Sequence, residues 1–313
     1  MIRLILAIAL AFTAALAQAS ARFSFAVIGD TPYYSGEEWM YAEMLKDLDR
    51  EDLAFVVHIG DFKSGSSPCS DELFAQRLRQ FQSVRHPFIF VPGDNEWTDC
   101  HRGGADPLER LAKLREIFYP DDDSLGGRKL KLERQSADPR FAEYRENVRW
   151  SIGPALFIGL NIPGSNNNFG RTPQMDDEYA RRGQANAAWL AQGFAVAKKN
   201  NHAAVFIAIQ ADPHFERASR RPANAADGYA QFRQELLAHT LAFGKPVILI
   251  HGDTHRHRVD QPLVDPATQK PVGRFTRIES FGSPSVDWIR VSVDPADPKL
   301  LAINTGAQIN SAR

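Results

Sequence analysis

Four Gly-Asp pairs in this sequence each follow an apolar stretch of strand length, and their aspartates are Asp30, Asp61, Asp94 and Asp253. In α/β proteins the ligand crevice lies outside the carboxyl ends of the strands, where glycine lets the chain turn sharply. Carboxylates that converge in such a crevice repel each other unless cations neutralise them. The four pairs therefore predict a site for divalent metal ions, although any single pair is also typical of a turn with a helix N-cap.

Histidines follow the fourth pair in the run His251-Gly252-Asp253-Thr254-His255-Arg256-His257. Imidazole and carboxylate groups are both common ligands of hydrolytic metal ions. We therefore add His255 to the predicted ligands.

Alternating strands and helices must position these residues, and the hydrophobic spacing locates most of them. On the helix expected at 37–48, Trp39, Met40, Met44 and Leu48 share one face. The late strands complete an α/β domain expected to span residues 22–313. Strands are expected at 22–28, 53–59, 87–91, 145–152, 155–160, 203–209, 246–251, 275–280, 286–293 and 300–303. Helices are expected at 37–48, 71–84, 106–118, 177–199 and 229–243. Loops are expected at 120–140 and 164–171.

The composition is that of a folded globular protein, with 43% hydrophobic and 24% charged residues in 313. The formal net charge of −1 argues against nucleic-acid binding. A basic start, a short apolar run and an Ala-x-Ala pattern predict a secretory signal peptide at residues 1–21. No second long apolar run follows, so we expect a periplasmic or secreted protein without a membrane segment.

The sequence has two cysteines, Cys69 and Cys100. In an oxidising compartment we expect them to form one disulfide. Two unpaired buried thiols are the alternative, and a two-cysteine metal site is disfavoured because no C-x-x-C spacing occurs.

The ordered motifs resemble those of the calcineurin-like metallophosphoesterase superfamily, which carries D-x-H, G-D-x-x-[DNY], G-N-H-[DE], an isolated His and G-H-x-H at strand ends. The resemblance covers roughly residues 23–293. It implies a four-layer α/β/β/α sandwich of two mixed β-sheets flanked by helices. The corresponding segments here are Gly29-Asp30-Thr31-Pro32, Gly60-Asp61-Phe62-Lys63, Gly93-Asp94-Asn95-Glu96 and Gly252-Asp253-Thr254-His255.

Several positions depart from the family pattern. Pro32 stands at the first histidine, Asp94-Asn95 replaces Asn-His, and Asp253 replaces a histidine. Gln210 or Asp212 lies where the isolated histidine would be. The resemblance implies two divalent ions held by Asp30, Asp61, Asp94, Asp253, His255 and Gln210, with Asp61 as the bridge. Such a carboxylate-rich set suits Mn, Mg or Ca better, relative to Zn or Fe, than the family norm.

The resemblance implies hydrolysis of a small-molecule phosphate monoester or diester by metal-activated water. The candidate catalytic residues are Asn95 at the family's leaving-group histidine, His257, and Lys63 facing the substrate phosphate. Asn95 cannot act as a general acid, so His101, His214, His251 and His257 are candidates for that role. The alternatives are a non-catalytic, metal-stabilised binding module on the same fold and a one-metal hydrolase of another ester class. Glu96 is expected to bond backbone groups or brace a ligand.

Overall fold

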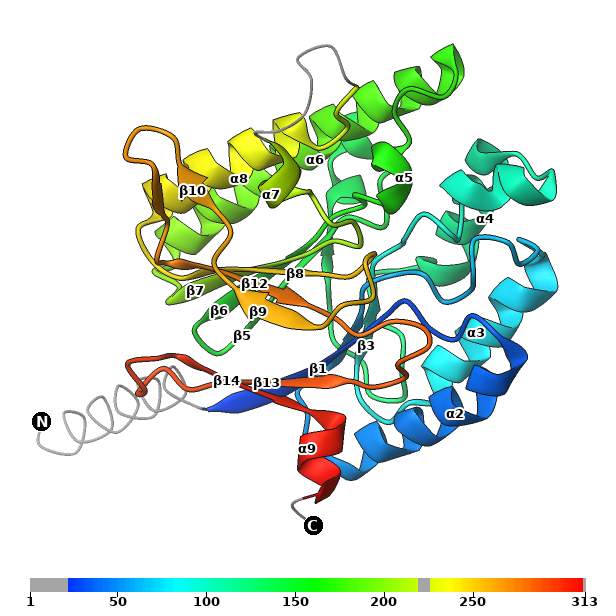
Figure 1. The fold of residues 1–313 in the computed structure, drawn as a ribbon, viewed down its shortest axis with the longest axis horizontal. Coiled ribbons are helices and arrows are strands. Elements are labelled where there is room, and N and C mark those ends of the chain that lie inside the picture. The colour runs from blue at the N-terminus through cyan, green and yellow to red at the C-terminus, as the bar shows by residue number, and fades with distance from the viewer. Residues whose placement is uncertain (1–21, 219–225, 312–313) are drawn as a thin grey trace, which may run out of the picture.

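Two large β-sheets pack face to face, with helices on both outer faces (Figure 1). The computed structural model describes residues 22–218 and 226–311. The predicted signal peptide lies outside the described residues. Two mixed sheets flanked by helices confirm the predicted fold class.

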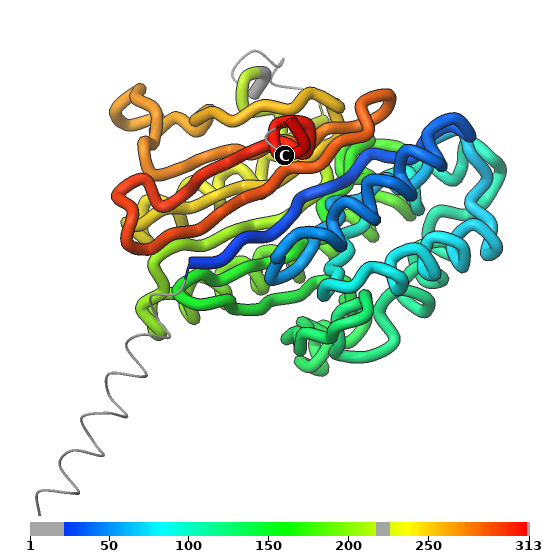
Figure 2. Tube along the Cα trace, turned by 90° about the horizontal axis from the view of Figure 1, so that it is seen from below, coloured from blue at the N-terminus to red at the C-terminus, as the bar shows by residue number. Residues whose placement is uncertain are grey.

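The first sheet has the strand order β14-β13-β1-β2-β3. Strands β1, β2 and β3 are parallel, whereas β13 pairs antiparallel with β1 and with β14. The last strands of the chain thus lie beside the first, as Figure 2 shows. The strands are β1 (Phe23–Ile28), β2 (Val56–His58), β3 (Phe88–Phe90), β13 (Ile289–Val293) and β14 (Leu301–Thr305).

The second sheet has the order β4-β5-β6-β7-β8-β12-β9, with β6, β7, β8 and β12 parallel. A separate two-stranded ribbon pairs β10 with β11. The strands are β4 (Glu133–Arg134), β5 (Val148–Ile152), β6 (Ala155–Gly159), β7 (Ala204–Ala208), β8 (Val247–His251), β9 (Arg258–Asp260), β10 (Val264–Asp265), β11 (Lys270–Pro271) and β12 (Phe275–Glu279).

Helices α2, α3 and α4 cover the first sheet, and α6 and α8 cover the second (Figure 1). In β1, Phe25 and Val27 face the other sheet while Ala26 and Ile28 face the helices, as strand geometry requires. The helices are α2 (Ser35–Arg50), α3 (Asp71–Ser83), α4 (Pro107–Phe118), α5 (Gly164–Asn167), α6 (Pro173–Lys199), α7 (Phe215–Ala218), α8 (Ala230–Phe243) and α9 (Gly306–Ser311), with 3-10 turns η1 (Thr98–Gly103), η2 (Gln135–Ala137) and η3 (Pro139–Phe141).

The buried face of α2 differs from the predicted one. Trp39 is 66% exposed, and the buried apolar side chains are Tyr41, Met44, Leu45 and Leu48. These four follow the i, i+3, i+4, i+7 spacing of one helix face. Trp39 lies two residues before Tyr41, which turns it by roughly 200° to the solvent side.

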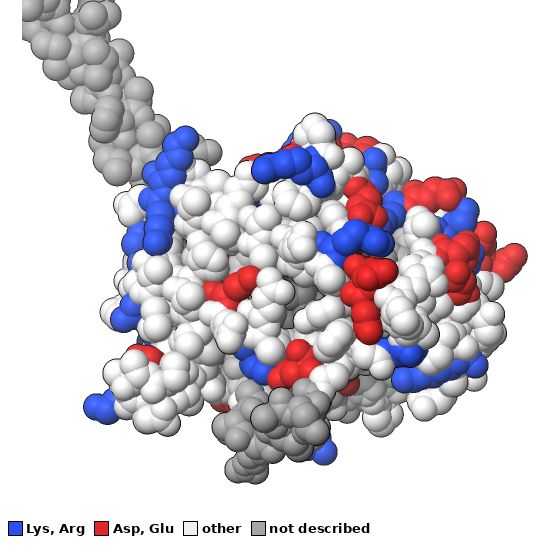
Figure 3. Space-filling model, turned by 90° about the horizontal axis from the view of Figure 1, so that it is seen from above, with Lys and Arg blue, Asp and Glu red and all other residues white. Residues whose placement is uncertain are grey.

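Within the described residues, no helix is long and apolar enough to cross a membrane. On the face seen in Figure 3, Lys and Arg side chains mix with Asp and Glu, and neither sign dominates. On this face the acidic and basic side chains are therefore not separated into one acidic and one basic half, in keeping with the near-zero net charge of the sequence.

Candidate metal centre

Both sheets contribute aspartates to one cluster. Asp30, Asp61 and Asp94 follow β1, β2 and β3, which are parallel neighbours, so the three leave the same edge of the first sheet. Asp253 follows β8 of the second sheet. Its backbone N–H lies 3.2 and 3.1 Å from the two carboxylate oxygens of Asp30. The predicted convergence at strand ends is thus a junction between two sheets.

Two glycines permit this approach. A Cβ atom on Gly252 would lie 1.9 Å from Oδ2 of Asp30, and one on Gly93 would lie 2.1 Å from Oδ1 of Asp61. Real Cβ atoms do not come so close to another heavy atom. The glycine of each pair therefore makes room for the carboxylate of another pair.

Four residues of the cluster adopt left-handed backbone conformations. The φ angles are 53° at Asp30, 59° at Asp61, 76° at Asp253 and 61° at His255. Non-glycine residues seldom adopt this region, and such conformations concentrate at functional sites. The backbone here is shaped to direct these four side chains.

Tyr33, Asn95 and Gln210 occupy the space around the carboxylates. Oδ2 of Asp61 accepts hydrogen bonds from the Tyr33 hydroxyl at 3.0 Å, from Nδ2 of Asn95 at 2.8 Å and from Nε2 of Gln210 at 3.2 Å. Gln210 also lies 3.5 Å from Oδ1 of Asp30. The structure thus places Gln210 among the carboxylates.

Asp212, the other candidate at this position, pairs instead with His214 and Arg258 at 3.5 and 3.3 Å. Its only contact with the four aspartates is through its backbone N–H, which donates to Oδ2 of Asp253 at 3.1 Å in the described structure. Burial acts to raise the pKa of Asp212, but the hydrogen bonds from His214 hold it below its usual range. Asp212 therefore anchors the rim of the site.

The four aspartates are strongly disfavoured as anions in the metal-free protein. Burial, followed by the charge of Asp253, raises the pKa of Asp30 well above its usual range. Burial, followed by the charge of Asp94, raises the pKa of Asp61 well above its usual range. Burial, and next Asp99, raises the pKa of Asp94 to about 7. Burial, and next Asp94, raises the pKa of Asp253 to about 7. Desolvation and like-charge repulsion both favour binding of a cation here.

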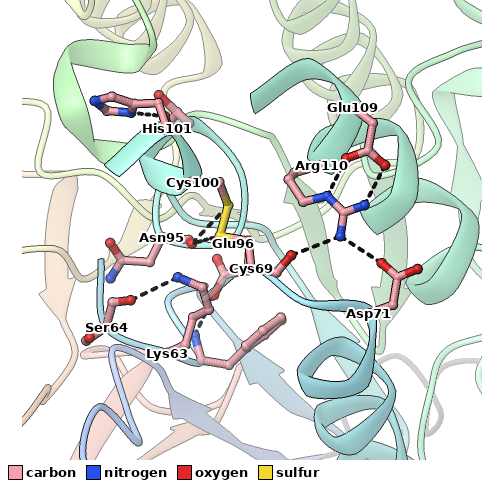
Figure 4. Close-up of a disulfide and its surroundings, with 12 residues drawn as sticks. Lys63, Ser64, Cys69, Asp71, Asn95, Glu96, Cys100, His101, Glu109 and Arg110 are labelled. Atoms are coloured by element: carbon pink, nitrogen blue, oxygen red, sulfur yellow. Dashed lines mark hydrogen bonds and ion pairs between the residues drawn. A yellow bond between two sulfur atoms is a disulfide. The ribbon is translucent and has the colours of Figure 1, made fainter. Parts of the chain in front are cut away.

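Among the described residues, His255 and Lys63 are basic side chains near this cluster. Nε2 of His255 lies 3.9 Å from Oδ1 of Asp30 and 3.2 Å from the Tyr33 hydroxyl. Lys63 is only 1% exposed, its Nζ donates to the backbone oxygen of Ser64 at 2.9 Å (Figure 4), and burial lowers its pKa. Lys63 is therefore buried in the protein. This burial does not fit the predicted contact between Lys63 and a substrate phosphate.

Glu96 organises the backbone beneath the cluster. Its carboxylate accepts hydrogen bonds from the backbone N–H groups of Asp61, Phe62 and Gly93 at 3.0, 2.6 and 2.8 Å. These bonds tie the ends of β2 and β3 together. These contacts are the bonds to backbone groups expected of Glu96.

Ser165 was not anticipated from the sequence. It lies in a left-handed turn with the three following asparagines, and its hydroxyl is 2.8 Å from Oδ2 of Asp94 and 2.7 Å from Oδ1 of Asp99. The consecutive asparagines, which tolerate left-handed φ, are the signal that could have indicated a structured turn rather than a loop. Tyr33 was also missed, because only the fold brings it to Asp61.

None of the four histidines proposed as general acids bonds Asp61, Asp94 or Asp253 in the described structure. His214 pairs with Asp212 at 3.5 Å, and the backbone N–H of Asp212 in turn donates to Asp253. His257 bonds the backbone oxygen of Glu279 and stacks on Phe281 with ring centroids 4.5 Å apart. His101 bonds the backbone oxygen of Thr98. His251 is fully buried, which lowers its pKa to about 4. Asn95, by contrast, lies inside the cluster, where its amide donates hydrogen bonds to Tyr33 and Asp61 but is not an acid that could protonate a leaving group.

Cys69 and Cys100 form the predicted disulfide, with their Cα atoms 5.7 Å apart. It joins the loop after Asp61 to η1, which follows Asp94, and both sulfur atoms lie near the backbone oxygen of Asn95 (Figure 4). Arg110 reinforces this wall by contacts with the backbone oxygen of Cys69 and with Asp71. The disulfide therefore links two loops that carry site residues.

The donor set fits a hard divalent cation. Oδ1 of Asp94 is buried and has no hydrogen-bond partner within the described structure. As the side chains stand, no three His, Cys, Asp or Glu residues among those described are arranged to hold a metal ion. Tyr33, Asn95 and Gln210 instead bond to the carboxylate oxygens that would be ligands. Cation binding at these oxygens therefore requires some of those hydrogen bonds to be exchanged.

Comparison with known proteins identifies the family. A profile described as calcineurin-like phosphoesterase matches residues 23–257, which is more than half of the chain. The chain belongs to the calcineurin-like phosphoesterase family. A search of curated protein sequences finds no match.

Solved structures share the fold of this family member at low sequence identity. One titled PhoD aligns with a TM-score of 0.53 and 14% identity, covering 91% of this chain and 68% of that one. A dimetal phosphatase from Danio rerio aligns with a TM-score of 0.51 and 13% identity, covering 87% of this chain and 93% of that one. Family membership supports metal-dependent hydrolysis of phosphate esters as the general chemistry.

Proposed function

We propose that the protein hydrolyses a small-molecule phosphate ester at two divalent cations held by Asp30, Asp61, Asp94 and Asp253 with Gln210 and His255. The observation that supports this most directly is that three buried aspartates from the first sheet and the partly buried Asp253 from the second sheet meet beside one partly exposed histidine. The metal ions, when bound, would activate water and neutralise charge on the phosphoryl group. Mn²⁺, Mg²⁺ or Ca²⁺ is expected to support activity better, relative to Zn²⁺, than in relatives with more histidine ligands.

The side chains around the aspartates would orient rather than transfer protons. The Asn95 amide and the Tyr33 hydroxyl both bond Oδ2 of Asp61, and Asn95 also donates to Tyr33 at 2.9 Å. Gln210 is held by the backbone N–H of Gly164, which donates to its Oε1 at 2.6 Å. These contacts fix the direction of Asp61 and limit water access. Substrates with a good leaving group should therefore react fastest, because Asn95 cannot protonate a poor one.

Hydrolysis of p-nitrophenyl phosphate and bis(p-nitrophenyl) phosphate tests the proposal. The protein is first treated with a chelator and then assayed with Mn²⁺, Mg²⁺, Ca²⁺ and Zn²⁺ in turn. Turnover that depends on added metal and disappears on chelation supports it. Absence of turnover with every metal on both esters contradicts it.

A second candidate function is a metal-stabilised binding module without turnover. It is favoured by Asn95, which occupies the position of the family's leaving-group histidine but carries no titratable proton. Metal-dependent rises in melting temperature without hydrolysis of either ester would favour this function over the first.

We also propose that the protein is exported to the periplasm or outside the cell. The basic, apolar and Ala-x-Ala pattern of residues 1–21 supports this, as does a disulfide between Cys69 and Cys100. Fractionation of expressing bacterial cells, with N-terminal sequencing of the mature protein, tests the location and the cleavage point. A cytosolic protein that retains Met1 would refute it.

A further inference from the structure

Arg102 lies on the disulfide side of the site, in η1. Its Nη2 is 2.8 Å from Oδ2 of Asp99, whose side chain is 2% exposed, whereas the side chain of Arg102 is 53% exposed. One edge of the guanidinium is therefore held against the protein, and the rest of the group reaches solvent. Within the described residues, this side chain forms an ion pair with Asp99.

Gly65 shows where the guanidinium lies. A Cβ atom on Gly65 would be 2.5 Å from Nη1 of Arg102 and 2.7 Å from Oδ1 of Asn95. Arg102 and Asn95 are therefore close neighbours at Gly65. Since Asn95 bonds Asp61 through its other amide atom, Arg102 stands one side chain outward from the carboxylate cluster.

The backbone that carries Arg102 is held firmly to the site. The backbone N–H of Asp99 donates to the backbone oxygen of Asp94 at 2.9 Å. Cys100 is fixed by its disulfide to Cys69 (Figure 4), and Gly104 ends η1 in a left-handed conformation. The position of Arg102 relative to Asp94 is thus set by covalent and hydrogen-bonded links on both sides of it.

Two other basic side chains near η1, Lys63 and Arg171, are already engaged in contacts with the protein. Lys63 is buried and donates to the backbone oxygen of Ser64. Arg171 donates to the Thr98 hydroxyl at 2.7 Å and bonds the backbone oxygen of the same residue. Arg102, in contrast to these two residues, is more than half exposed and is held next to Asn95 by its ion pair with Asp99.

We propose that Arg102 binds a non-bridging phosphoryl oxygen of the substrate, with Asp99 holding it in place. This rests on the proposed function and adds a substrate-binding residue to it. A guanidinium presents a planar fork of N–H donors that matches phosphate oxygens, and such charge-assisted hydrogen bonds are stronger than neutral ones. Asp99 occupies Nη2, and Nη1 lies beside Gly65, close to the point that Oδ1 of Asn95 also approaches.

The test measures binding of inorganic phosphate to the Mn²⁺-loaded protein by calorimetry, alongside kinetics with p-nitrophenyl phosphate. We expect Arg102→Gln to weaken phosphate binding at least tenfold and to raise KM similarly, with kcat changed less than threefold. The matched control is Arg140→Gln, because Arg140 also pairs with an aspartate, Asp138 at 2.6 Å, and is 79% exposed. The control should bind phosphate like the wild type.

Arg102→Lys covers the case in which Arg102→Gln fails to fold, because lysine keeps a charge opposite Asp99. It lacks the planar fork, so we expect at least threefold weaker phosphate binding. Phosphate affinity within twofold of wild type in the folded variants, or no phosphate binding by the wild type, overturns the assignment. A wild type that binds phosphate through Arg102 but hydrolyses neither ester would refute the proposed hydrolase and leave this assignment standing.

Discussion

The variant Asp94→Asn should stabilise the metal-free protein at alkaline pH. Burial and Asp99 raise the pKa of Asp94 from its ordinary 3.8 to about 7, a difference equivalent to about 4 kcal/mol between its two protonation states. Asparagine has the same shape without the charge, and its oxygen can still accept the hydrogen bond from Ser165. Allowing about 1 kcal/mol for altered hydrogen bonds, the net gain at pH 8 is about 3 kcal/mol.

The sign follows from proton linkage. Because the pKa of Asp94 is higher in the folded than in the unfolded state, the folded state binds the proton more tightly. The stabilisation is complete below about pH 4, and it declines as the pH rises until the group has ionised above about pH 7. Asp253 behaves in the same way, since its pKa is also raised to about 7. The advantage of Asp94→Asn should therefore be absent at pH 4 and largest at pH 8.

Thermal unfolding in excess chelator between pH 4 and pH 9 measures the effect. A gain of about 3 kcal/mol predicts a melting temperature higher by roughly 5 °C or more at pH 8. The control variant is Asp177→Asn, which changes an exposed aspartate on α6. Added Mn²⁺ should stabilise the wild type more than Asp94→Asn at pH 8. An equal melting temperature of variant and wild type in chelator at pH 8, or a difference that does not vary with pH, would refute the reasoning.

Three further outcomes are expected. Asp61→Ala should abolish hydrolysis while the circular dichroism spectrum is retained. The reason is that three side chains converge on this carboxylate and metal charge stabilisation is worth several kcal/mol. A variant with more than about a tenth of wild-type turnover would contradict this prediction. Asp253→His should raise Zn²⁺ affinity relative to Mn²⁺ in calorimetric titrations, because imidazole is the softer ligand, and an unchanged metal preference would show that Asp253 is no ligand. Thiol labelling of the denatured, unreduced protein should find neither Cys69 nor Cys100 free, and two labelled thiols per chain would exclude the disulfide.

The metal-site region was largely accessible from the sequence because its positions depend on local patterns. A buried apolar strand followed by Gly-Asp specifies where each carboxylate leaves the sheet, and parallel pairing brings Asp30, Asp61 and Asp94 to one edge. The disulfide followed from having two cysteines in an expected oxidising compartment. The order of the motifs identified the family over most of the chain.

The tertiary structure decided the features that depend on long-range contacts. The orientation of Lys63 could not be read from its position two residues after Asp61, because burial of its side chain depends on the wall built by η1. Trp39 was misplaced because helix spacing alone does not say which of two apolar stripes faces the sheet.

Tyr33, Ser165 and Arg102 show the same division. Tyr33 and Ser165 contact aspartates that are distant in sequence, whereas Arg102 pairs with Asp99 three residues before it, in the turn that the disulfide joins to the loop after Asp61. Residue type and strand periodicity are local properties, so the sequence by itself determined the strand-end aspartates and the chemistry they favour, and the two-sheet fold class followed from the family resemblance of its motifs. Which side chains fill the space between those aspartates depends on how two sheets and their loops pack, and only the tertiary structure decides that.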